Sequence, residues 1–400
     1  MNFLTIDDLG LDGKTVFLRV DMNTPIDPKS GELLELNRII EASVSVRDLA
    51  NCKLVIGSHQ GRPGRYDYIP LNKHAIALSN VLKRPVQYIE DIVGPAAQKA
   101  IDSLSPGDIL LLDNLRFMTE ENMEFSAEQA SKTIMVQRLY RHFEGCVLDA
   151  FPTGHRAHPS IVGFSHLLPT GSGRLVAKEL KALNRILTVV KGPFVTVLGG
   201  AKVSDRLGAI DTLIANRRAD KVLLSGVIAN VFLKASGKLK GSISAEEEKF
   251  VPKARTLMDE YSETFQLPLD VVVERNGETA EIKMEDLRPD EKIYDIGPET
   301  IDYFSRIIRS SGTIFMSGPP GFFEDPRFGK GTEKLLRAMS SSLGTTIVSG
   351  GHLSAALERF GIKEWIDHVS TAGGALVLYL AGKRLPLMEA LENAAERMKK

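Results

Sequence analysis

Short apolar runs alternate with longer segments of helical periodicity along most of the chain, and this alternation constrains the fold most strongly. In the first half, the apolar runs predict strands at residues 15–20, 53–58, 86–89, 109–112 and 146–149. The segments between them predict helices at residues 36–50, 72–82, 94–104 and 127–143. Continuously apolar strands separated by helices are typical of a parallel sheet covered on both faces.

The alternation resumes in the second half, after a Pro/Gly/Ser-rich boundary segment at residues 167–173. A long helix is predicted at residues 174–190. Strands are then predicted at residues 194–198, 221–225, 270–274, 313–317 and 345–349. Helices are predicted at residues 203–217, 245–264, 299–311 and 351–360. The pattern therefore favours two similar α/β domains joined by a helix.

Composition and charge exclude several classes of protein. The 400 residues suffice for two or three domains with buried cores, and the net charge of −1 argues against a general nucleic-acid-binding surface. The two cysteines, Cys52 and Cys146, are too few for a disulfide framework and fit a reducing compartment. No signal-peptide pattern and no run of about 18 apolar residues occurs. We expect a cytoplasmic protein without nucleic-acid or membrane partners.

The segment FVTVLGGAKVSD (194–205) predicts a phosphate site. A buried strand leads into Gly199 and Gly200, then Lys202, and then a helical pattern. Glycines at such a turn let backbone N–H groups approach an anion, while the helix N-terminus and the lysine add favourable charge. The segment matches neither the P-loop nor the dinucleotide fingerprint, so a plain tight turn is the alternative.

Cationic side chains follow several predicted strands of the first half, where parallel strands present their ligand-binding edge. These residues are Arg19, Arg38, His59, Arg62, Arg116, His155, Arg156 and His158. Their grouping predicts a pocket for a small, multiply anionic ligand, because arginine binds carboxylate and phosphate well. Solvent-exposed loops are the alternative. His155 and His158 could ligate zinc with Asp149 or Cys146, but no metal-ligand pattern is complete.

The strand ends of the second half are rich in glycine and almost free of arginine. They contain Gly199, Gly200, Gly226, Gly318, Gly321, Gly350, Gly351, Gly373 and Gly374. Backbone donors and helix N-termini of this kind are suited to a polyphosphate. Glu324 could bind ribose hydroxyls, or it could be an ordinary glutamate in a helix's first turn. A cationic half and a nucleotide-binding half together indicate group transfer.

Together these motifs resemble the phosphoglycerate kinase family from end to end, and the pattern is similar to its archaeal branch. The matching segments are RVDMNTP (19–25), SHQGRP (58–63), LLDNLRF (111–117), DAFPTGHRAHPS (149–160), GGAKVSD (199–205), ANVFLKA (229–235), IGPET (296–300), SGPPGFFE (317–324), SGGH (349–352) and STAGGA (370–375). The resemblance implies two Rossmann-like domains, with parallel sheets facing each other across a hinged cleft.

The resemblance also implies the domain limits. A 3-phosphoglycerate-binding domain would span residues 1–170, an interdomain helix 174–190, and a nucleotide-binding domain 191–375. The C-terminal helix, residues 386–400, would return to the first domain. Hinges are expected at residues 170–173 and 370–374, and the protein is expected to be a monomer.

Site residues are carried over from the resemblance by position. The implied 3-phosphoglycerate ligands are Asp21, Met22, Asn23, Arg38, His59, Gln60, Gly61, Arg62, Arg116 and Arg156. The implied nucleotide ligands are Gly199, Gly200, Lys202, Arg206, Glu324, Gly350, Gly351, His352 and Leu353. Arg38 and Lys202 would neutralise charge on the transferring phosphoryl group, while backbone donors near Gly351 and Gly373 would assist.

Four positions depart from the family pattern. The family commonly has Lys at Arg206, Asn at Ser317 and Asp-Thr at His352-Leu353. That Asp commonly contacts the Mg²⁺ that accompanies ADP or ATP. The protein contact to the metal is therefore unknown, and Mg²⁺ could be held by phosphates, water and Asp205.

The implied reaction is reversible phosphoryl transfer between 1,3-bisphosphoglycerate and ADP, giving 3-phosphoglycerate and ATP, in glycolysis and gluconeogenesis. Transfer would be direct and in line, without a covalent enzyme intermediate, upon domain closure. The alternatives are another small-acid kinase or ligase, and a catalytically impaired protein that binds nucleotide and phosphoglycerate. A dehydrogenase is disfavoured because the dinucleotide fingerprint is absent.

Overall fold

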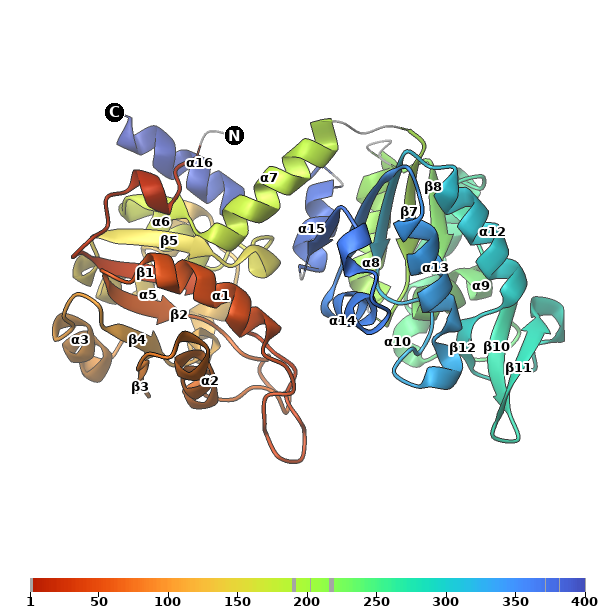
Figure 1. Ribbon diagram of the computed structural model, residues 1–400, viewed down its shortest axis with the longest axis horizontal. Coiled ribbons are helices and arrows are strands. Elements are labelled where there is room, and N and C mark those ends of the chain that lie inside the picture. The colour runs from red at the N-terminus through yellow and green to blue at the C-terminus, as the bar shows by residue number, and fades with distance from the viewer. Residues whose placement is uncertain are drawn as a thin grey trace. The chain divides into compact units, whose positions relative to one another are not determined.

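The computed structural model describes residues 3–188, 192–201, 203–215, 219–370, 372–380 and 382–399. The chain divides into two compact units, here called unit 1 (residues 1–181 and 384–400) and unit 2 (residues 182–383), as shown in Figure 1. Among the described residues, no helix is both long and apolar enough to cross a membrane.

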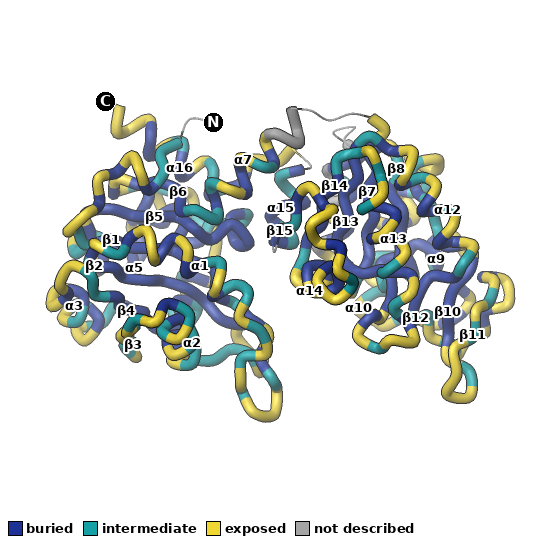
Figure 2. The backbone as a smooth tube through the Cα atoms, in the orientation of Figure 1, coloured by how far each residue is buried: buried dark blue, intermediate teal, exposed yellow. Residues whose placement is uncertain are grey.

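Unit 1 is built on a six-stranded, wholly parallel sheet with the strand order β3-β4-β2-β1-β5-β6. Its strands are β1 (Thr15–Val20), β2 (Lys53–Gly57), β3 (Gln87–Ile89), β4 (Ile109–Leu112), β5 (Gly145–Asp149) and β6 (Thr170–Ser172). The central strands are buried along nearly their whole length, as Figure 2 shows, because helices cover both faces. β6 occupies part of the segment that composition marks as a boundary.

The helices of unit 1 include one that leads into unit 2 and one from the C-terminus. They are α1 (Asn37–Asp48), α2 (Asn72–Leu82), α3 (Pro95–Asp102), α4 (Ala127–Ser131), α5 (Ile134–Leu139), α6 (Phe164–Leu167), α7 (Arg174–Thr188) and α16 (Pro386–Met398). Short helical turns are η1 (Ile6–Asp8), η2 (Leu115–Phe117), η3 (Thr119–Asn122), η4 (Tyr140–His142), η5 (Phe151–Thr153) and η6 (Pro159–Gly163). α16 packs against β6 and α6.

Asp149, at the end of β5, fixes the start of α7. Its carboxylate accepts hydrogen bonds from Ser45 Oγ on α1 (2.6 Å) and from the Val176 N–H (3.0 Å). Burial raises the pKa of this carboxyl to about 7, and hydrogen bonds from Ser45 and the helix backbone oppose that rise. Arg174 adds ion pairs to Asp7 and Asp48. The first turn of α7 is thereby tied to α1.

Unit 2 contains a second six-stranded parallel sheet, with the order β15-β14-β13-β7-β8-β9, and a three-stranded antiparallel sheet, β11-β10-β12. Its strands are β7 (Phe194–Leu198), β8 (Lys221–Leu224), β9 (Phe265–Gln266), β10 (Asp270–Arg275), β11 (Glu278–Lys283), β12 (Ile293–Ile296), β13 (Thr313–Ser317), β14 (Thr345–Ser349) and β15 (His368–Ser370). The two parallel sheets confirm the predicted fold class.

The helices of unit 2 alternate with these strands. They are α8 (Val203–Ala215), α9 (Gly226–Ala235), α10 (Ala245–Glu248), α11 (Val251–Glu260), α12 (Pro298–Arg309), α13 (Lys330–Ser340), α14 (Gly351–Arg359) and α15 (Gly374–Leu380). Short turns are η7 (Met284–Asp286), η8 (Pro326–Phe328) and η9 (Lys363–Trp365). Apolar side chains of β7, β13, α12, α13 and α14 share one core.

Three secondary-structure predictions are wrong in detail. The strand expected at residues 270–274 pairs in the antiparallel sheet rather than in the parallel one. The helix expected at 127–143 breaks into α4 and α5, where Thr133 is extended. The helix expected at 245–264 breaks between α10 and α11. Pro252 lies in the first turn of α11, where a backbone amide hydrogen is not needed for a helical hydrogen bond.

Candidate functional site

The loop after β1 holds an acidic side chain against a cationic one. Arg38, at the start of α1, donates to Asp21 Oδ1 at 2.7 Å, and the Asn23 N–H donates to the same oxygen at 3.0 Å. Asp21 is 4% exposed, and its Oδ2 has no hydrogen-bond partner among the described residues. One buried acceptor oxygen beside a guanidinium is therefore available to a ligand that carries a hydroxyl group.

The loops after β1 and β2 are hydrogen-bonded to each other. Gln60 accepts from the Thr24 N–H and donates to the Thr24 carbonyl, both at 3.0 Å, while Ser58 Oγ accepts from the Met22 N–H at 2.9 Å. Asn23 Oδ1 accepts from the Gly61 N–H at 2.9 Å. Since Gln60 and Met22 are fully buried, their side chains hold the loops in place and present no surface of their own.

The end of β4 joins this arrangement through Asn114, which is fully buried. Its amide donates to the carbonyls of Gln60 (2.8 Å) and Ile69 (2.9 Å) and accepts from the Gln60 and Arg116 N–H groups, both at 3.2 Å. The Arg116 guanidinium donates to the Gly61 carbonyl at 2.5 Å. Burial, then Arg19, lowers the pKa of Arg116 to about 10, whereas Asp21 raises it.

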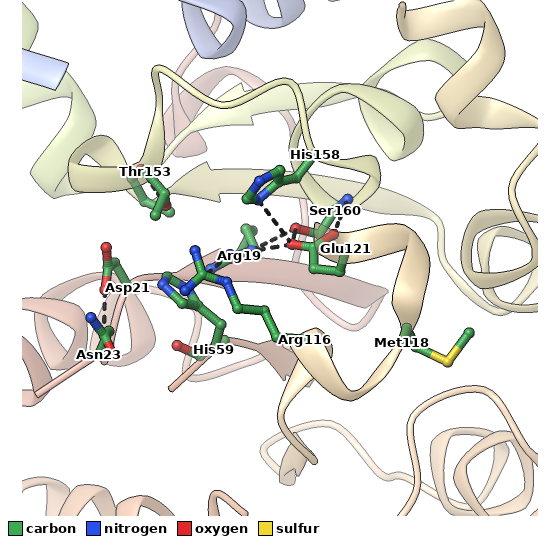
Figure 3. Close-up of polar contacts among 12 residues, drawn as sticks. Arg19, Asp21, Asn23, His59, Arg116, Met118, Glu121, Thr153, His158 and Ser160 are labelled. Atoms are coloured by element: carbon green, nitrogen blue, oxygen red, sulfur yellow. Dashed lines mark hydrogen bonds and ion pairs between the residues drawn. The ribbon is translucent and has the colours of Figure 1, made fainter. Parts of the chain in front are cut away.

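A buried ionic network lies beneath these loops (Figure 3). Arg19 and Glu121 are fully buried, with Arg19 Nη2 3.5 Å from Glu121 Oε1. Ser160 joins them: its Oγ accepts from Arg19 Nε at 2.7 Å and donates to Glu121, and its N–H also donates to Glu121 at 3.1 Å. Arg19 is therefore a buried cation paired with Glu121, and its side chain is not exposed to a ligand. No role is predicted from the sequence for Glu121, or for Ser160, which ends the matching segment 149–160.

The histidines near this network are neutral at physiological pH. Burial lowers the pKa of His59 well below its ordinary value, and the charges of Arg116, Arg19 and Arg38 lower it further. Burial, then Arg19 and Arg116, lowers the pKa of His158 to about 3. No group of three or more His, Cys, Asp or Glu side chains among the described residues could hold a metal ion.

Two further arginines of unit 1, Arg62 and Arg156, are exposed to solvent. Arg62 is exposed and close enough to Arg116 to lower its pKa. Arg156, whose side chain is 41% exposed, pairs with Glu124 at 3.0 Å. Hydrogen bonds and electrostatic effects link Asp21, Asn23, Arg38, Gly61 and Arg116 of the ten predicted ligands, whereas Met22 and Gln60 are buried supports and Arg156 pairs elsewhere. Binding of an anionic ligand by these ten residues stays a prediction.

In unit 2, the loops after β7, β8 and β13 interlock through their backbones. The Gly199 N–H donates to Ser317 O at 3.0 Å, and the Gly200 N–H donates to Pro319 O at 2.9 Å. Gly318 has φ +81°, and a Cβ at that position would collide with the Gly199 carbonyl. The two glycine N–H groups expected to bind phosphate are therefore occupied, and these glycines serve close packing of the loops.

Arg206, on α8, joins the same loops. It is 9% exposed, and its guanidinium donates to Ser317 Oγ at 2.7 Å and to the Gly199 carbonyl at 3.4 Å. Two of the positions at which this chain departs from the family pattern, Arg206 and Ser317, are thus in contact. The Arg206 guanidinium is therefore a cation at the end of β7, hydrogen-bonded to uncharged protein acceptors.

The loops after β14 and β15 form a second arrangement. The Gly350 N–H donates to Ser370 O at 3.0 Å, and Ser349 Oγ donates to Ala372 O. Gly350 has φ +109° and precedes α14, whose first N–H groups, on Gly351, His352 and Leu353, have no acceptor among the described residues. A helix N-terminus with three free donors is suited to an anion.

The remaining predicted nucleotide residues differ in what they can offer. Leu353 is fully buried, so only its backbone can act, whereas His352 and Glu324 are exposed. Gly373 immediately precedes α15. Lys202 and the Asp205 side chain lie outside the described part of the chain, so their predicted roles are not tested here.

Comparison with known proteins matches the whole chain to one family. The family model for phosphoglycerate kinase matches residues 6–383. Phosphoglycerate kinases from Methanothermus fervidus and Methanobacterium bryantii are 40% and 41% identical, each match covering 100% of this chain and 99% of the relative. The solved structure of phosphoglycerate kinase from Pyrococcus horikoshii superposes with a TM-score of 0.90 at 36% identity, covering 98% of this chain and 100% of that one. The chain therefore belongs to the phosphoglycerate kinase family.

Proposed function

We propose that this protein is an active phosphoglycerate kinase, which transfers a phosphoryl group reversibly between 1,3-bisphosphoglycerate and ADP. Family membership over nearly the full length supports the activity. The observation that carries the proposal is the buried, unpaired Oδ2 of Asp21, which lies beside Arg38 and close enough to Arg116 for Asp21 to raise the pKa of that guanidinium. Arg38 and Arg116, with this hydroxyl acceptor, would match the charged and hydroxyl groups of 3-phosphoglycerate, and Arg62 and Arg156 are assigned to the same ligand from the sequence.

The nucleotide is assigned to unit 2. We place its phosphates at the free N–H groups of α14 and its ribose near Glu324, with Gly199, Gly200 and Gly318 shaping the surface beneath. Lys202 is assigned to the moving phosphoryl group from the sequence alone. Mg²⁺ would arrive with the nucleotide, because the described residues offer no ready-made metal cluster, and when bound it would neutralise phosphate charge.

The residues of unit 1 would perform two tasks in this reaction. Arg38, oriented by Asp21, would stabilise charge on the transferring group. Arg116, held by Gly61 and Asn114, would fix the acidic substrate in position. The acceptor is a substrate carboxylate, so no protein nucleophile is required. Because the two proposed half-sites lie on different units, the reaction requires the units to close around both substrates.

A coupled assay with 3-phosphoglycerate, ATP and Mg²⁺ tests this function. The proposal predicts turnover that needs all three components and that falls when 2-phosphoglycerate or a three-carbon hydroxy acid without phosphate is substituted. ATP binding without turnover would instead support the catalytically impaired binding protein.

A cytoplasmic location and a monomeric state are also proposed. Both cysteines are buried free thiols, which fits a reducing compartment. Light scattering coupled to size exclusion tests the oligomeric state, and a mass near 43.9 kDa is expected.

A further inference from the structure

His59 is surrounded by positive charge, yet its geometry is that of a neutral donor. Its side chain is 2% exposed and lies beside Arg116 in Figure 3. Arg19 Nη2 is 3.2 Å from His59 Nδ1. The titratable groups that act on this imidazole are the charged side chains of Arg116, Arg19 and Arg38 and the neutral ring of His158. The contact with Arg19 decides where the ring carries its proton.

An arginine guanidinium carries only donors and stays protonated, so the nitrogen that faces it must accept. Nδ1 of His59 therefore has no hydrogen, and a neutral ring carries its single proton on Nε2. A doubly protonated ring would turn an N–H of Nδ1 toward the N–H of Arg19, which is repulsive. Nε2 makes no hydrogen bond to any described residue.

Arg19 cannot easily turn away from the histidine. Its guanidinium is fully buried and also donates to Ser160 Oγ, the Val20 carbonyl and Glu121. Glu121, itself fully buried and hydrogen-bonded twice by Ser160, keeps this cation in place. The network thus holds one Arg19 donor against Nδ1 in the absence of any ligand.

We propose that Arg19 fixes His59 as the neutral Nε2–H tautomer, so that His59 gives the acidic substrate an uncharged hydrogen bond and not a positive charge. This inference rests on the proposed function, because the acceptor is taken to be an oxygen of 3-phosphoglycerate. The arginines then supply the charge of the site, and His59 supplies an uncharged donor. Arg19 and Glu121 act through His59 as positioning residues.

Long-range ¹H–¹⁵N correlation spectra of the ligand-free, full-length protein at pH 7 test the tautomer directly. His59, assigned by difference with His59→Gln, is expected to show a protonated Nε2, an unprotonated Nδ1 and no titration between pH 5.5 and pH 8. A doubly protonated ring, or a proton on Nδ1, would overturn the proposal. This spectrum needs no substrate, so it stands even if the proposed reaction is absent.

Two substitutions test the donor. His59→Gln places an amide N–H near the position of Nε2, whereas His59→Asn can still accept from Arg19 but lacks a donor that reaches as far. We expect 3-phosphoglycerate to bind within about 3-fold of normal to the Gln variant and about 10-fold more weakly to the Asn variant, the loss typical of one hydrogen bond to a charged group. Equal affinities in the two variants would overturn the donor role, provided that ATP affinity and melting temperature are unchanged. Failure of the unaltered protein to bind 3-phosphoglycerate would refute the proposed function instead.

Discussion

In both units the strands of a six-stranded parallel sheet end in loops at one edge, but the groups that these loops present differ between the units. Unit 1 presents side chains: arginines, an aspartate and a histidine, supported by buried amides and a buried ion pair. Unit 2 presents backbone: interlocked glycine loops and the free N–H groups of a helix. From this difference we expect unit 1 to tolerate the loss of a charged side chain with little change of fold, whereas one added methyl group should strain the interlocked backbone of unit 2.

The largest effect should follow from removing the charge of Arg38 in unit 1. Arg38→Ala should lower kcat by about 10²-fold or more, because a donor to the transferring group is lost. The fold should be retained, because Asp21 keeps its hydrogen bond from the Asn23 N–H, while the lost ion pair should lower the melting temperature. Arg47→Ala, on the same helix but bonded to Ser43 and Val81, is the matched control and should keep normal turnover. Near-normal kcat in the Arg38 variant would remove that residue from the mechanism.

Gly318→Ala probes the interlocked backbone of unit 2. The left-handed φ and the collision with the Gly199 carbonyl should together cost about 2 kcal/mol or more of unfolding free energy. ATP affinity should fall while 3-phosphoglycerate affinity is retained, as separate titrations would show. Gly208→Ala, in α8 with open space around the new Cβ, is the control and should be neutral or stabilising by about 1 kcal/mol. A Gly318 variant as stable as the parent would break the comparison.

Asn114→Asp tests the buried amide that supports the arginines of unit 1. The substitution keeps the shape but sets a carboxylate against the carbonyls of Gln60 and Ile69. We expect KM for 3-phosphoglycerate to rise about 10-fold and KM for ATP to stay constant. Asn122→Asp, which loses more exposed bonds to Arg116 and Met118, should have a much smaller effect. Equal rises in both KM values would mean that Asn114 merely stabilises the fold.

Two buried groups, His74 of unit 1 and Asp295 of unit 2, should contribute opposite pH dependences to stability, and this is the smallest effect. His74 of unit 1 is fully buried, and burial lowers its pKa from 6.5 to about 4. Between pH 4 and 6.5 the unfolded chain binds a proton that folded His74 does not, so stability falls as the pH falls. His74→Gln should reduce the slope of the unfolding free energy against pH by the contribution of about one proton, measured by denaturant unfolding across that range.

Asp295 of unit 2 should show the reverse dependence. Burial raises the pKa of its carboxyl to about 7, so the folded state holds the extra proton and stability falls as the pH rises from 4 to 7. Asp295→Asn should remove that slope. Unchanged slopes in both variants would show that neither group titrates as its burial requires.

The sequence predicts the fold class well, because buried strands and amphipathic helices follow short-range periodicity. The antiparallel sheet was missed because β11 is exposed on alternate residues and β12 is short, so neither has a continuous apolar run. The break between α4 and α5 was missed because the helical spacing of apolar residues continues across it.

The site was only partly predictable. Cationic strand ends and the start of the first helix predict Arg38, Arg62, Arg116 and Arg156 as ligands, because parallel strands gather their carboxyl ends at one edge. The sequence could not separate Arg19 from these residues, since its burial depends on Glu121, which lies 102 positions away. Nor could it show that the Gly199 and Gly200 N–H groups bond to the loop after β13, because that contact depends on long-range pairing.

Hydrogen exchange of the intact protein with each substrate alone is the most direct test of the division between units. The account predicts that 3-phosphoglycerate slows exchange at residues 21–24, 58–62 and 114–117 of unit 1. It predicts that Mg²⁺–ATP alone slows exchange at residues 318–324 and 350–354 of unit 2. Protection of the unit 2 segments by 3-phosphoglycerate alone, or of the unit 1 segments by nucleotide alone, would contradict it.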